Sequence, residues 1–170
     1  TPLADATMAA ADRAGLAAFQ KNVAELTRAA FAADEETAAL AARVRRIRQT
    51  AAGLAGAPDS LMPAVLRAEK TIDEIRLALD GYEAKASFEE VPPAPMPIRN
   101  RVEELIGIQF STTAAPGKTQ IENYRAARED LEALIGKLET LKTVSLPALE
   151  KTLDEHRAPW TPGRIVKIGE

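Results

Sequence analysis

Residues 16–54 read LAAFQKNVAELTRAAFAADEETAALAARVRRIRQTAAGL, and the spacing of their apolar side chains decides the fold class. Apolar or small positions recur at alternating steps of three and four residues, which places them on one face of a helix. They are Leu16, Phe19, Val23, Leu26, Ala30, Ala33, Thr37, Leu40, Val44, Ile47, Ala51 and Leu54. The pattern predicts one long helix over about residues 8–54, on the order of 70 Å in length. A kink near the acidic cluster at Asp34 is the alternative.

A second apolar stripe follows the turn signals Gly53, Gly56 and Pro58 and predicts a helix that ends near Ala86. Because the connection is short, the two helices are expected to form an antiparallel hairpin. The expected register brings both apolar and oppositely charged residues together. Its pairs are Leu54 with Leu61, Val44 with Ile72, Arg46 with Glu69 and Arg43 with Asp73.

The second half of the chain alternates proline-rich and helical segments. Four prolines in residues 91–97 predict an extended crossing, and a short helix is expected over residues 98–110. Thr119 is expected to cap a long helix in which Pro147 introduces a kink. Residues 158–170 contain further prolines and glycine and predict an extended tail.

Composition agrees with these patterns. The chain has 170 residues, of which 46% are hydrophobic and only 4% aromatic, which suits close helix packing better than a β-sandwich or barrel. We therefore expect an all-α fold: an antiparallel bundle of about four helices, formed by residues 1–170 as one domain and belonging to a larger protein. No apolar run approaches the roughly 18 residues of a membrane span.

Several kinds of chemistry are excluded or disfavoured by residue content. The absence of cysteine excludes thiolate chemistry, and the single histidine, His156, excludes sites that need two. A net charge of −3 does not favour nucleic-acid binding. Pro116-Gly117-Lys118-Thr119 resembles the end of a phosphate-binding loop, but Thr112 stands where that motif needs glycine. We expect no catalytic, cofactor-binding or metal-binding residue in this chain.

The remaining candidates are a basic cluster and a single tryptophan. Arg43, Arg45, Arg46 and Arg48 are expected to form ion pairs beside the apolar stripe and to aid solubility. Trp160 lies between two prolines in the tail. It either folds back over the end of the bundle or anchors a contact with another domain, where tryptophan is enriched.

Three segments carry a family resemblance. Ser111-Thr112-Thr113-Ala114-Ala115-Pro116, with Thr119-Gln120 and Tyr124 after it, resembles the C-terminal helical region of bacterial sortilin-like proteins. These proteins carry BNR-type β-propeller repeats and are often assigned to the glycosyl hydrolases. The segments 146–150 and 158–164 are similar to the last helix and terminus of the same family, and the match is strongest over residues 97–164.

The resemblance implies an exported precursor, periplasmic or extracellular, in which a β-propeller and a small β-domain precede this bundle. Any hydrolase activity would then be expected in the propeller, and this chain would be a non-catalytic accessory domain that docks on the propeller or β-domain. The residues expected to make the inter-domain contact are Trp160, Pro162 and Arg164 in the tail and Thr112 and Thr113 in the loop. The alternative is a stand-alone helical module for protein–protein interaction or self-association.

Overall fold

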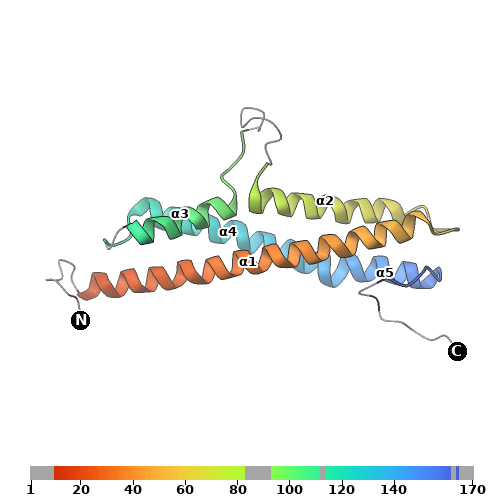
Figure 1. The fold of residues 1–170 in the computed structure, drawn as a ribbon, viewed down its shortest axis with the longest axis horizontal. Coiled ribbons are helices and arrows are strands. Elements are labelled where there is room, and N and C mark those ends of the chain that lie inside the picture. The colour runs from red at the N-terminus through yellow and green to blue at the C-terminus, as the bar shows by residue number, and fades with distance from the viewer. Residues whose placement is uncertain (1–9, 83–92, 112–113, 162–163, 165–170) are drawn as a thin grey trace. The chain divides into compact units, whose positions relative to one another are not determined.

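The computed structural model describes residues 10–82, 93–111, 114–161 and 164, and this part of the chain is helical without any strand. Its elements are α1 (Ala10–Ala52), α2 (Leu61–Asp80), α3 (Ile98–Ser111), α4 (Lys118–Thr140), the π-helical turn η2 (Leu141–Ser145) and α5 (Leu146–Glu155) (Figure 1). Because α4, η2 and α5 follow one another without a break, four helices result in these residues. The predicted all-α helical bundle is confirmed.

Helix α1 remains helical through Asp34, as the uninterrupted apolar spacing predicted. The expected stripe is buried from Val23 to Ala51, whereas Leu16 and Phe19 nearer the helix start are only partly covered. Thr37 occupies one position of the stripe, and its hydroxyl donates to the carbonyl oxygen of Ala33 at 2.6 Å. The buried hydroxyl is therefore satisfied within the helix, without a partner from another element.

Contacts between residues divide the chain into two compact units. The first contains Thr1–Ala32 and Ala78–Glu132, and the second contains Ala33–Leu77 and Ala133–Glu170. Helices α1, α2 and α4 each contribute residues to both units. We describe each unit by itself.

In the first unit, α4 packs with α3 and with the first part of α1. The Phe19 ring on α1 meets the Tyr124 ring on α4 edge-on, with the ring centroids 5.8 Å apart. The Asn123 amide on α4 donates to the Glu104 carboxylate on α3 at 3.1 Å. The buried residues of α3 are Ile98, Val102 and Leu105, which follow the predicted helix spacing.

Helix α2 ends at Asp80, six residues before the predicted end near Ala86, which itself lies outside the described residues. The physical reason is Gly81, whose φ of 78° is left-handed and ends the helix. A β-carbon at Gly81 would lie 2.6 Å from the Pro97 Cγ atom. The start of α3 is further joined to the end of α2 by Arg99, which donates to the Asp80 carboxylate at 2.5 Å.

The predicted cap of the fourth helix is also corrected. Thr119 lies inside α4, and the residue that precedes the helix is Gly117. The Gln120 side chain accepts a hydrogen bond from the Gly117 amide at 2.7 Å, which is one half of a capping box. The Gln120 side chain, three residues after Gly117, thus provides a hydrogen-bond acceptor for the Gly117 amide. Without it, this amide at the start of the helix would be hydrogen-bonded only to water.

In the second unit, α2 runs antiparallel to α1, as predicted, and Val44 and Ile72 of the expected register line one groove. The two predicted charge pairs are wrong, however. Glu69 pairs with Arg48 at 3.0 Å and not with Arg46, and Arg43 pairs with Glu150 on α5 and not with Asp73. The reason is that Arg45 and Arg48 lie on the side of α1 that shares this groove with Glu69 and Asp73, whereas Arg43 lies on the side that meets α5.

The π-helical turn η2 forms where the sequence analysis expected Pro147 to kink the helix. The Leu146 amide donates to the carbonyl oxygen of Leu141, five residues earlier. Leu141 and Leu146 are both buried, so the wider turn keeps the apolar stripe on one face across a five-residue step. Pro147 lacks an amide hydrogen and suits the first turn of α5 that follows.

Helix α5 ends in a Schellman motif that uses an arginine where glycine is usual. The Ala158 amide donates to the Leu153 carbonyl at 2.9 Å and the Arg157 amide to the Asp154 carbonyl at 3.0 Å. Arg157 has a φ of 52°, in the left-handed region that disfavours side chains.

Arg157→Gly is accordingly expected to stabilise the protein by about 1 kcal/mol, since glycine adopts this conformation without steric strain. Thermal and urea unfolding measure the change. Lys151→Gly, in the exposed interior of α5, should instead destabilise by about 1 kcal/mol. Destabilisation by both substitutions would contradict the assignment of strain to Arg157.

Candidate functional site

The structure describes two of the five residues expected to make an inter-domain contact. Trp160 and Arg164 are described, whereas Thr112, Thr113 and Pro162 lie outside the described residues. The indole Nε1 of Trp160 donates to the Arg164 carbonyl oxygen at 2.6 Å. The two tail residues selected from the sequence are therefore in direct contact.

Arg164 joins the tail to the end of α5. Its side chain is only 5% exposed, and its Nη2 atom donates to the Asp154 carboxylate on α5. Its Nη1 atom donates to the Pro159 carbonyl oxygen at 2.9 Å, whereas its buried Nε atom has no hydrogen-bond partner. An arginine held by a carboxylate and a backbone carbonyl fixes the conformation of the chain between them.

Trp160 is 57% exposed despite this attachment. Because the indole N–H is already bonded, the exposed part is mainly the apolar ring. The ring is held in one orientation by the Arg164 cluster, in which Arg164 is hydrogen-bonded to Trp160, Pro159 and Asp154. A fixed and exposed aromatic ring loses little entropy on binding and can contribute a large apolar contact.

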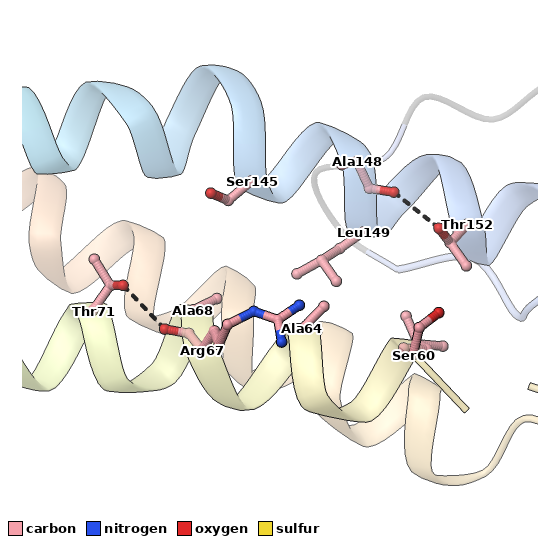
Figure 2. Close-up of a pocket in the computed structure, with 10 residues that line it drawn as sticks. Ser60, Ala64, Arg67, Ala68, Thr71, Ser145, Ala148, Leu149 and Thr152 are labelled. Atoms are coloured by element: carbon pink, nitrogen blue, oxygen red, sulfur yellow. Dashed lines mark hydrogen bonds between the residues drawn. The ribbon is translucent and has the colours of Figure 1, made fainter. Parts of the chain in front are cut away.

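A groove lies between α2 and α5 in the second unit. Its volume is about 540 Å³, and small side chains line both walls (Figure 2). Its lining residues are Ser60, Leu61, Ala64, Arg67, Ala68, Thr71, Ser145, Ala148, Leu149 and Thr152. Two hydroxyls bond to their own helices, Thr71 to the Arg67 carbonyl and Thr152 to the Ala148 carbonyl. The lining contains no carboxylate or imidazole for acid–base chemistry.

The basic cluster separates into paired and unpaired arginines. Arg43 donates to both carboxylate oxygens of Glu150 at 2.6 Å, a bidentate pair that is largely buried. This hydrogen bonding raises the pKa of Arg43 above its ordinary value. The stability that this raised pKa of Arg43 represents is therefore fully present at neutral pH, and it decreases as the pH rises through the raised, strongly alkaline pKa.

Arg43→Gln is expected to lower the free energy of unfolding by about 1–3 kcal/mol, because it leaves the largely buried Glu150 charge without its partner. Arg46→Gln is the matched control, since Arg46 is exposed and forms no ion pair with a described residue. The control should change stability by less than about 0.5 kcal/mol. Equal urea midpoints for the two variants would refute this role of the pair.

His156 is exposed at the end of α5, with its Nδ1 atom 2.9 Å from the Thr152 carbonyl oxygen. Among the described side chains, no group of three His, Cys, Asp or Glu residues is arranged to hold a metal ion. Within the same part of the chain, none of the helices combines the length and apolar character needed to cross a membrane.

The α2–α5 groove was not predicted, although Ser60, Ala64, Ala68 and Thr71 recur at helical spacing in the sequence.

Comparisons with protein-family models, with curated proteins and with solved structures give no match.

Proposed function

We propose that this chain is a non-catalytic docking domain of a larger exported protein, and that the domain it contacts is a β-propeller or a small β-domain of the same precursor. The observation that carries this proposal is the exposed ring of Trp160, which the Arg164 cluster holds in place. Tryptophans of this kind are frequent among residues that dominate binding energy at protein interfaces. The sortilin-like resemblance of residues 97–164 supports the choice of partner.

Tryptophan fluorescence can test this proposal, because Trp160 is the single tryptophan of the chain. The coding sequence upstream of Thr1 is first determined, and the domain it encodes is titrated into this chain while tryptophan fluorescence is recorded, with the signal of the added domain subtracted. We expect a blue shift of the Trp160 emission as the ring leaves water.

Trp160→Ala should weaken this binding by about 30-fold, measured by calorimetry, as expected of a dominant interface residue. Phe110→Ala is the control, since Phe110 is an 89% exposed aromatic residue at the end of α3 in the other unit. A start codon immediately upstream of Thr1, or equal binding by both variants, would overturn the proposal. A concentration-dependent dimer of the isolated chain would favour the self-association module instead.

A further inference from the structure

A second groove in the second unit, between α1 and α2, contains more positive charge than its own carboxylates neutralise. Its volume is about 210 Å³. Its lining residues are Ala41, Val44, Arg45, Arg48, Glu69, Ile72, Asp73 and Arg76. Three guanidinium groups therefore share the groove with two carboxylates, in a chain whose net charge is −3.

The arginines of this groove differ in their partners. Arg48 donates to both carboxylate oxygens of Glu69, at 3.1 and 3.0 Å. Arg45 and Arg76 are exposed, and neither forms an ion pair or hydrogen bond with a residue in the described ranges. Two exposed guanidinium groups thus line one groove, one from α1 and one from α2.

The floor of the groove is apolar, because Ala41, Val44 and Ile72 are buried beneath the arginines. An apolar floor between charged walls suits a polypeptide segment that carries both apolar and charged side chains. The guanidinium group matches carboxylate geometry and is weakly hydrated, so its pairing with a partner carboxylate costs less desolvation than that of an ammonium group.

We infer that the α1–α2 groove docks an acidic polypeptide segment whose carboxylates pair with Arg45 and Arg76. This inference rests on the proposed docking function and adds the chemistry of the partner surface. A nucleic acid fits less well, because no aromatic side chain lines the groove for base stacking.

The test uses the intact chain and a synthetic peptide that alternates glutamate with alanine. Arg45→Glu and Arg76→Glu should each weaken peptide binding by about fivefold or more at low salt, measured by calorimetry. Arg67→Glu is the matched control, because it makes the same charge change at another exposed arginine of α2. Arg67 lines the α2–α5 groove and not the α1–α2 groove. Arg67→Glu should weaken binding by less than about twofold.

Three outcomes would overturn the inference: no binding of the peptide to the wild-type chain, equal losses in all three variants, or tighter binding of an RNA oligonucleotide than of the peptide. The docking function is tested separately with the upstream domain. If that domain binds Arg76→Glu as well as it binds the wild type, the groove inference fails and docking stands. If the upstream domain binds neither the wild type nor Arg76→Glu, but peptide binding depends on Arg45 and Arg76, only the proposed function fails.

Discussion

Gly81→Ala should lower the free energy of unfolding by about 2–5 kcal/mol. A residue with a side chain is strained by about 1–2 kcal/mol in the left-handed conformation that Gly81 adopts. The new methyl group would also lie 2.6 Å from the Pro97 Cγ atom, and relief of such overpacking typically costs about 1–3 kcal/mol. Urea unfolding followed by circular dichroism measures the total.

Two further variants separate these contributions. Gly107→Ala, in α3 of the same unit, meets no atom within 4 Å and should stabilise by about 0.5–1 kcal/mol through helix propensity. Adding Pro97→Ala to Gly81→Ala removes the clashing ring and should restore the part of the loss that overpacking causes. If the double variant is no more stable than Gly81→Ala alone, the contact with Pro97 is not responsible.

Leu146→Ala should destabilise the protein by about 3–5 kcal/mol. Leu146 is fully buried at the junction of η2 and α5, so its truncation removes apolar contacts and leaves a cavity that the neighbouring helices fill only in part. Val144→Ala provides the control within η2, because Val144 is 62% exposed, and its effect should stay within about 0.5 kcal/mol. Similar thermal midpoints for the two variants would contradict the packing described for α5.

The helices could be predicted from the sequence because each depends on a local pattern. The steps of three and four residues in α1 fix one buried face regardless of what packs against it. The five-residue step from Leu141 to Leu146 also indicates a π-helical turn. A kink at Pro147 was predicted there instead. Gly81 could likewise have placed the end of α2, since glycine is the usual residue there.

The ion pairs between helices were harder to predict from the sequence than the helices themselves. The partner of Arg43 is 107 residues away in the sequence, and its choice depends on how α1 and α5 pack. The side of α1 from which an arginine reaches α2 also depends on packing, so the stripes alone could not show that Arg48 and not Arg46 pairs with Glu69. Both grooves arise from such packing, which is why neither was predicted, whereas Trp160 was visible as an unusual residue in an unusual position.

The division of the chain into two units limits where the protein can be truncated. The boundary between the units falls inside α1, α2 and α4, after Ala32, Leu77 and Glu132. Natural domain boundaries usually fall in linkers that can be cut without breaking a helix. Here each cut would create helix ends with several unbonded amide or carbonyl groups. Neither unit is therefore a sensible truncation product, and the two units should be expressed in one chain.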